Sequence, residues 1–386
     1  MTAASMQQEQ SLYSGVPGVT LRHIVDAQSG RREWETVHAW VTAMVRHPVN
    51  ADPDACGLFE GAPAVAYALH LADRPSYASA LLTLDHHITT MTRLRLQAAH
   101  RRIDRGELPQ LREYDLISGL TGLGVHLLTR GNHETLLLET LCYLVRLTEP
   151  VAAGHDLLPG WWTGDGPELR PSPRWPGGHG NLGMAHGICG PLAFMSICMR
   201  RGITVTGQSE AIRSICTTFD QWCLGSGERP WWPETLSRGE WDTRMPRRGH
   251  RPGRPSWCYG TPGIARARQL AALALGDAPL QHHAEAALAA CAIDEQQLAQ
   301  LTDASLCHGW AGLVRTVQRA AADAGPDSTL SSRLPRLHDQ MYDYLEQTGS
   351  PPPGLMEGMD GVHLTQLDSV NTASVQRWDA CLLLDG

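Results

Sequence analysis

Apolar residues recur at helical spacing along most of the chain. The segments 79–84, 135–141 and 264–275 carry leucine, isoleucine or alanine at the period of a helix face. Other apolar stretches, such as 65–69 and 192–195, directly follow short glycine-containing motifs. This alternation of helical segments and glycine motifs predicts an all-α protein.

The glycine motif is a repeat, Gly-x-x-Gly, with seven copies. Its copies begin at Gly15, Gly61, Gly119, Gly187, Gly260, Gly309 and Gly358, and the second copy ends in Ala64 instead of glycine. Glycine at the start of a helix lets backbones approach closely and leaves free N–H groups. With about two helices per copy, the repeat predicts an α/α toroid, a double ring of about seven inner and seven outer helices. We expect residues 1–386 to form one such domain.

Two intervals interrupt the repeat and are rich in proline, glycine and tryptophan. We expect loop insertions near 154–182 and 224–256. The second interval carries Trp231, Trp232 and arginines at 244, 247, 248, 251 and 254. These segments are either surface loops packed on the toroid or an aromatic and cationic rim that grips an extended ligand.

Chemically distinctive residues occupy the two positions before the first glycine of several copies. These pairs are Ile117-Ser118, Ala185-His186, Cys258-Tyr259, Cys307-His308 and Met356-Glu357. If every copy starts an inner helix at the same rim, all of these pairs face one central cavity. Two thiolates and one imidazole form a three-ligand zinc set, and a catalytic zinc keeps its fourth position free. The sequence therefore predicts one Zn²⁺ per chain, bound by Cys258, Cys307 and His308.

Composition excludes several other functions. The chain has no lysine, because all 32 basic residues are arginine, which excludes a pyridoxal-phosphate Schiff base, a lysine aldolase and a P-loop nucleotide site. A net charge of −8 argues against nucleic-acid binding. Ten cysteines without a regular framework, and no signal peptide, favour a reducing cytosol. No apolar run is long enough to span a bilayer.

Three motifs resemble the signatures of the lanthionine synthetase C-like family, the class I lanthipeptide (lantibiotic) cyclases. They are Gly183-x-x-His186-Gly187-x-x-Gly190, Trp257-Cys258-Tyr259-Gly260-x-Pro262-Gly263 and Cys307-His308-Gly309-x-Ala311-Gly312. The resemblance covers the whole chain, because the glycine repeats match the toroid of that family. It implies zinc on Cys258, Cys307 and His308, with further active-site residues Asp115, His186, Arg254 and Tyr259.

The resemblance also implies an activity. A cyclase of this family adds peptide cysteine thiols to dehydroalanine or dehydrobutyrine, forming lanthionine or methyllanthionine thioether rings. His186 is suited to protonate the enolate or to take the thiol proton first, and Asp115 to orient its imidazole. Arg254 is suited to hold the enolate oxygen, and Tyr259 to add a hydrogen bond or an aromatic wall.

The implied partners are a dehydrated precursor peptide as substrate, a separate dehydratase and an export transporter. The expected location is the cytoplasm of a bacterium with a GC-rich genome. Association with the inner face of the membrane would then occur through the partners.

Each candidate residue also has a purely structural interpretation. Asp115 could cap the helix that follows it, Arg254 could be a solvated charge, and Tyr259 could serve packing alone. Glu357 could be a salt-bridge partner.

Three other functions stay open at this stage. One is a non-catalytic zinc-containing scaffold of the same family that binds a peptide or glutathione. Another is a zinc-thiolate prenyl-type transferase, although that chemistry usually needs a carboxylate ligand and a lysine and arginine cluster. A glycosidase on an α/α toroid would give the cysteine motifs no role.

Overall fold

The inner helices of the fold begin at the repeated glycine motifs. In the computed structural model, which describes residues 9–153, 156–225, 227, 229–367 and 377–386, Gly15, Gly61, Gly119, Gly260 and Gly309 each directly precede a helix. The second glycine of a copy packs against the loop before the first one. A Cβ atom at Gly122 would meet the carbonyl oxygen of Leu116, and one at Gly312 would meet that of Leu306.

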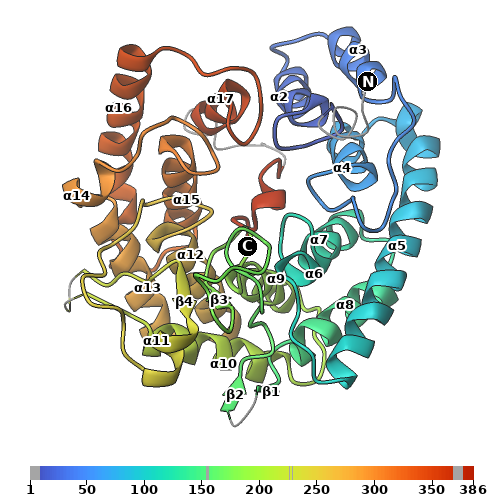
Figure 1. Ribbon diagram of the computed structural model, residues 1–386. Helices are drawn as coiled ribbons and strands as arrows, with labels where there is room; N and C mark the ends of the chain where they lie inside the picture. Colours follow the sequence, from blue (N-terminus) through green and yellow to red (C-terminus); the bar gives the residue numbers. More distant parts are fainter. Residues whose placement is uncertain (1–8, 154–155, 226, 228, 368–376) are drawn as a thin grey trace.

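These helices close into an inner ring (Figure 1), in which each contacts the next along the chain and the last contacts the first. The inner helices are α2 (Val16–Gln28), α4 (Ala62–Ala72), α7 (Leu120–Arg130), α9 (Cys189–Arg200), α12 (Thr261–Leu275), α15 (Trp310–Ala322) and α17 (Met359–Leu367). Burial on all sides marks this layer, since every residue from Thr261 to Ala272 of α12 is buried. Helices buried on all sides are mostly apolar, and the buried polar residues Arg266, Arg268 and Gln269 of α12 form hydrogen bonds.

Outer helices pack against the inner helix that precedes them in the chain. They are α3 (Trp34–Met44), α5 (Ala78–Asp104), α8 (Glu134–Arg146), α10 (Gln208–Gln221), α13 (Ala278–Cys291) and α16 (Leu330–Thr348). An outer helix buries one face only, as α16 does with Leu330, Leu337 and Met341. The two layers confirm the all-α toroid.

Short elements fill the connections. They are η1 (Pro75–Tyr77), α6 (Leu111–Tyr114), α11 (Arg238–Thr243), α14 (Glu295–Leu298), η2 (Ala380–Leu382), β1 (Val151–Ala153), β2 (Asp156–Leu158), β3 (His179–Asn181) and β4 (Thr235–Ser237). β1 pairs with β2, and β3 pairs with β4, both antiparallel. The β3–β4 pair joins the two intervals that interrupt the repeat.

Five of the six tryptophans of these intervals are buried. Trp161, Trp162 and Trp232 are at most 2% exposed, and the Trp162 and Trp241 ring centroids lie 5.6 Å apart. The arginines at 244, 247, 248 and 251 are exposed. Of the two interpretations of these intervals, packing on the toroid therefore describes these tryptophans, while the arginines face solvent.

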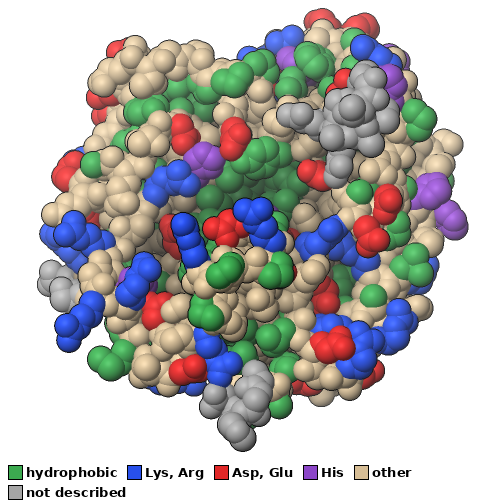
Figure 2. Space-filling model, viewed as in Figure 1, with side chains coloured by type: hydrophobic (Ala, Val, Ile, Leu, Met, Phe, Trp, Pro, Cys, Tyr) green, Lys and Arg blue, Asp and Glu red, His purple; other side chains and the backbone are tan. Residues whose placement is uncertain are grey.

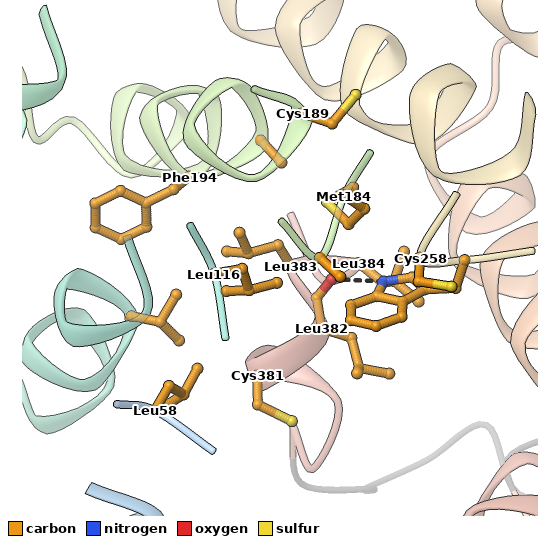
Figure 3. Close-up of a cluster of buried hydrophobic side chains, with 14 of the residues drawn as sticks. Leu58, Leu116, Met184, Cys189, Phe194, Cys258, Cys381, Leu382, Leu383 and Leu384 are labelled. Atoms are coloured by element: carbon orange, nitrogen blue, oxygen red, sulfur yellow. Dashed lines mark hydrogen bonds between the residues drawn. The ribbon is translucent and has the colours of Figure 1, made fainter. Parts of the chain in front are cut away.

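The C-terminal residues fill the centre of the ring. Leu382, Leu383 and Leu384 are almost completely buried, and the close-up in Figure 3 shows them beside Leu116 and Met184, which precede α7 and α9. The Trp257 indole donates a hydrogen bond to the Leu382 carbonyl oxygen at 3.0 Å.

The face shown in Figure 2 is hollowed at the centre of the ring. Hydrophobic side chains form the floor of the hollow, and arginine, acidic and histidine side chains surround it. In the part of the chain that the structure describes, no helix is long and apolar enough to cross a membrane.

Candidate metal centre

Backbone hydrogen bonds join the loops that precede the inner helices into a closed circle. Each loop donates to the next, and the loop before α17 donates to the loop before α2. The bonds are Leu12 N to Phe59 O, Phe59 N to Ile117 O, Leu116 N to Ala185 O, Ala185 N to Cys258 O, Cys258 N to Cys307 O, Cys307 N to Met356 O and Met356 N to Tyr13 O. Residues two positions before the first glycine of neighbouring copies therefore lie side by side.

The circle brings two cysteines and one histidine together. Cys258 and Cys307 belong to neighbouring copies, and the Cys258 N–H donates to the Cys307 carbonyl at 3.2 Å. The possible ligand atoms of Cys258, Cys307 and His308 all lie within 4.8 Å of one another. Bond lengths of about 2.3 Å to sulfur and about 2.0 Å to nitrogen separate the ligands of a tetrahedral zinc by roughly 3.5–4 Å. The three side chains therefore fit one ion and leave its fourth position to another ligand.

Two of the possible ligands, His308 and Cys258, each have a polar neighbour of their own. His308 Nε2 lies 3.3 Å from Asp303 Oδ2, and the Ser256 hydroxyl lies 3.6 Å from the Cys258 sulfur. Such neighbours fix the orientation of metal ligands. Tyr13 lies two loops from Cys307 in the hydrogen-bonded circle, and its hydroxyl donates to the Glu357 carboxylate at 2.6 Å.

Sequence reasoning missed these neighbours. Asp303 offered one local signal, since its Oδ1 accepts from the Ser305 N–H at 2.8 Å, a turn typical of Asp-x-Ser. Tyr13 occupies the position two before Gly15, which the inspection of the later copies did not include.

Hydrogen bonding between the two thiols favours ionisation of one of them. The hydrogen bond from Cys307 lowers the pKa of Cys258, and the positive charge of Arg254 acts in the same direction. A thiol whose pKa is lowered binds metal more readily, because the thiolate is the ligand.

Asp115 contacts both the turn before α7 and the imidazole of His186. It is 1% exposed, and its Oδ1 accepts hydrogen bonds from the backbone N–H groups of Ser118 and Gly119, both at 2.7 Å. Its Oδ2 lies 2.6 Å from Nδ1 of His186. Asp115 therefore holds the turn before α7 and contacts the imidazole, and α7 itself has no side-chain cap at Gly119.

His186 is held in a defined tautomer. Because Nδ1 donates to Asp115, Nε2 is the atom left to exchange a proton. Burial opposes protonation of the imidazole, but the hydrogen bond and charge of Asp115 outweigh it and raise the pKa of His186. The negative charge of Cys258 adds to this effect.

Tyr259 is both packed and hydrogen-bonded. Its ring fills the space that a Cβ atom at Gly183 would need, and its hydroxyl accepts from the Asn181 side chain at 3.0 Å. Burial raises the pKa of its hydroxyl group, which stays protonated.

Arg254 and Glu234 lie near the cysteines without a direct contact to them. Among the described residues, none forms a hydrogen bond or an ion pair with the Arg254 guanidinium, although its charge acts on both Cys258 and Glu234. Burial raises the pKa of Glu234, a residue that sequence reasoning also missed. In the described part of the chain, Glu357 forms no ion pair, and its hydrogen-bond partner is the neutral Tyr13 hydroxyl at 2.6 Å.

The double ring of helices around a central hollow makes the protein an α/α toroid. Two thiols and an imidazole converge where its inner helices begin and form a candidate metal centre. A family model described as lanthionine synthetase C-like protein matches residues 6–383, and the chain therefore belongs to this family.

Two similar proteins agree with this placement. The nisin biosynthesis protein NisC of Lactococcus lactis subsp. lactis is 22% identical over 386 residues, which covers 97% of this chain and 89% of that protein. A solved structure of nisin cyclase has a TM-score of 0.82 and 21% identity, and the match covers 98% of this chain and 92% of that one. At such identities the likeness shows the fold.

Proposed function

We propose that the protein is a zinc-dependent lanthipeptide cyclase. It would add cysteine thiols of a dehydrated peptide to dehydroalanine or dehydrobutyrine of the same peptide, forming lanthionine and methyllanthionine rings. Family membership supports the reaction class. The observation that carries the proposal is the convergence of the Cys258, Cys307 and His308 ligand atoms within 4.8 Å.

Cys258, Cys307 and His308 would hold one zinc ion, and the substrate thiol would take the fourth position. When bound, zinc supplies the Lewis acidity that converts the substrate thiol to a thiolate at neutral pH. The ligand set suits a soft nucleophile, because two thiolates already neutralise the charge of the ion.

His186 would move the protons of the reaction. Conjugate addition leaves an enolate that needs a proton at its α-carbon, and the thiol must lose a proton beforehand. The raised pKa of His186 keeps its imidazole charged to higher pH, which suits the acid role, and one histidine could perform both transfers in turn. Asp115 would keep Nδ1 occupied, so that Nε2 meets the substrate.

Arg254 and Tyr259 would act on the peptide. A guanidinium group without a described partner is available to hold the enolate oxygen. The Tyr259 ring, fixed by Asn181 and Gly183, would form a wall beside the cysteines.

The remaining proposals concern the setting of the protein. We propose that residues 1–386 form one toroid domain and that a separate dehydratase supplies the dehydrated peptide. The protein would work in the cytoplasm of a bacterium and reach the inner face of the membrane only through partners such as an export transporter.

Zinc content is the first test. We expect one equivalent per chain in the wild type purified without chelator, and loss of zinc in both Cys258→Ala and Cys307→Ala. Cys142→Ala, which removes an exposed thiol, is the matched control and should keep its zinc. A metal-free wild type would contradict the proposal.

Ring closure is the second test and separates a cyclase from a scaffold. A dehydrated peptide with free cysteines loses its reactivity toward a thiol-alkylating reagent when its rings close. His186→Ala should keep zinc and peptide binding but lose ring closure. A wild type that binds zinc and peptide, yet never closes a ring, would favour the non-catalytic scaffold.

A further inference from the structure

The chain between α11 and α12 carries arginines that have no ionic partner. The segment 243–256 contains five arginines and no acidic residue. Arg247, Arg248 and Arg251 are exposed, and within the described part of the chain their guanidinium groups form no hydrogen bond and no ion pair. Arg238, just before this segment, is paired with Asp242 at 2.6 Å. Unpaired positive charge is therefore concentrated in one loop.

Two of these arginines line a cavity. It has a volume of about 260 Å³ and lies between this loop and the segment 231–235, with Arg247, His250 and Arg251 on the loop side. A second cavity, of about 740 Å³, lies between Arg251 and the glutamines at 296, 297 and 300. Because Arg251 lines both cavities, they are neighbours and offer space for an extended segment.

His250 adds a buried atom that lacks a partner. Its Nε2 lies 3.3 Å from Glu240 Oε1, whereas its Nδ1 is buried and has no hydrogen-bond partner among the described residues. Buried polar atoms are normally satisfied by protein, water or ligand. In a neutral imidazole whose Nε2 donates to Glu240, Nδ1 is an acceptor. A ligand that fits the cavity therefore offers an N–H group as well as negative charge, as an acidic peptide does.

The smaller cavity adjoins the candidate metal centre. Glu234 is the one acidic side chain among the described residues that line it, and a Cβ atom at Gly253 would meet its Oε1. The charge of Arg254 acts on Glu234 and on Cys258. Arg247 and Arg251 therefore leave the lining with an excess of positive charge, and the same loop leads directly to a proposed metal ligand.

We infer that the loop 244–254 is a docking surface for an acidic segment of the peptide substrate, and that the cavity between Arg247, His250 and Arg251 receives one of its carboxylate side chains. The inference rests on the proposed function, because the occupant is the peptide whose rings the cyclase would close. Guanidinium groups pair with carboxylates through charge-assisted hydrogen bonds, and a backbone N–H of the segment would satisfy His250 Nδ1.

Charge also limits the length of the occupant. The net charge of −8 opposes a long polyanion, so a short acidic segment suits this local excess of arginine. Docking beside the metal centre would raise the local concentration of the peptide cysteines there.

Binding of a short acidic peptide tests the inference without ring closure. The probe is a fluorescein-labelled hexaglutamate, which has no cysteine and no dehydroamino acid, and fluorescence anisotropy measures its affinity. Arg247→Glu combined with Arg251→Glu should weaken binding about 10-fold or more, because charged hydrogen bonds are lost. Added salt should weaken binding to the wild type, and labelled hexaglutamine should bind less well than hexaglutamate.

Arg46→Glu combined with Arg93→Glu is the matched control. Both arginines are exposed and their side chains have no described partner, so the net charge changes equally while binding should stay at the wild-type level. Equal losses in the two double variants, or a wild type that does not bind hexaglutamate, would overturn the inference. Tighter binding of an oligothymidylate of equal length would assign a nucleic acid and overturn it too. If the Arg247→Glu, Arg251→Glu variant does not fold, Arg251→Gln decides by the same criteria.

Ring closure separates the inference from the proposed function. For a dehydrated peptide that carries an acidic segment, the Arg247→Glu, Arg251→Glu variant should raise KM by about the factor measured with hexaglutamate. A dehydrated peptide without acidic side chains should show no such increase. An equal KM in variant and wild type for the acidic peptide would overturn the inference while the cyclase stands. A wild type that binds hexaglutamate but closes no ring would overturn the proposed function and support the docking surface.

Discussion

Two pairs of loops in the same ring have the same backbone arrangement but carry side chains of different chemistry. The loops before α4 and α7 carry Phe59 and Ile117 at the position where the loops before α12 and α15 carry Cys258 and Cys307. All of these loops are linked by the same circle of backbone hydrogen bonds. Each loop also buries one apolar residue completely, three positions before its first glycine: Leu58, Leu116, Trp257 and Leu306.

The comparison shows that the scaffold and the candidate site are separate properties of the repeat. The glycines and the buried apolar residue build the ring, and the next two positions are free to carry chemistry. Two thiols can meet only in neighbouring copies, because the hydrogen-bonded circle places those copies side by side. The metal centre therefore depends on which copies carry cysteine, as well as on how many do.

The sharpest test of this comparison exchanges the residue directly before the first glycine in two loops, the loop before α9, where it is His186, and the loop before α7, where it is Ser118. His186→Ala should slow ring closure by about 10²–10⁴-fold, because it removes the proposed general acid. Ser118→Ala changes the same position in a loop without ligands and should leave the rate within a few-fold of wild type. Single-turnover ring closure measures both, with zinc content as the check. Equal rates in the two variants would show that this position carries no chemistry.

The second prediction concerns the scaffold and should affect both parts alike. Gly122→Ala and Gly312→Ala each force a Cβ atom against the backbone carbonyl of the preceding loop. Each should lower the free energy of unfolding by about 3 kcal/mol, the upper end of ordinary overpacking. Chemical denaturation measures it. Gly239→Ala, where a Cβ meets nothing within 4 Å, is the control. Destabilisation of only one part would mean that the loops are not equivalent.

A smaller effect is expected from the carboxylate beside His308. Asp303→Asn keeps the shape of the side chain but removes the charge that orients the imidazole at 3.3 Å. Zinc affinity should fall about 10–100-fold, as for other partners of metal-bound histidines. Chelator competition measures the loss, and Asp327→Asn, an exposed acid, should bind zinc like the wild type. Unchanged affinity in Asp303→Asn would show that this carboxylate does not support a ligand.

Periodic features of the sequence predicted the ring. Helical spacing and the Gly-x-x-Gly copies indicated the inner helices and the all-α toroid. The β3–β4 pair and the central position of Leu382–Leu384 had no comparable signal, because three-residue strands and a short apolar tail show no period.

The residues of the candidate site also divide into those that the sequence predicted and those that it did not. Cys258 and Cys307 occupy the same position in the repeat and His308 directly follows Cys307, and from this arrangement the sequence predicted that the three side chains meet. Asp303 reaches His308 through loop geometry that only the structure contains.

The final prediction concerns pH and the Asp115–His186 pair. Burial alone would lower the pKa of His186, and Asp115 reverses this and raises it. In Asp115→Asn, which keeps an oxygen to accept from Ser118 and Gly119, burial should prevail and the pKa should fall below the wild-type value. NMR titration of the imidazole measures this shift, with His186→Ala identifying the resonance.

The free energy of unfolding should depend on pH in the direction that the raised pKa of His186 implies. A histidine whose folded pKa is raised contributes stability that is fully present below its unfolded value near 6.5. That contribution is lost as the pH rises through the folded pKa of His186. The wild type should therefore exceed Asp115→Asn in free energy of unfolding most clearly in mild acid, and the difference should narrow in alkali. A difference that grows with pH would show that Asp115 stabilises the protein through the turn before α7 rather than through the histidine.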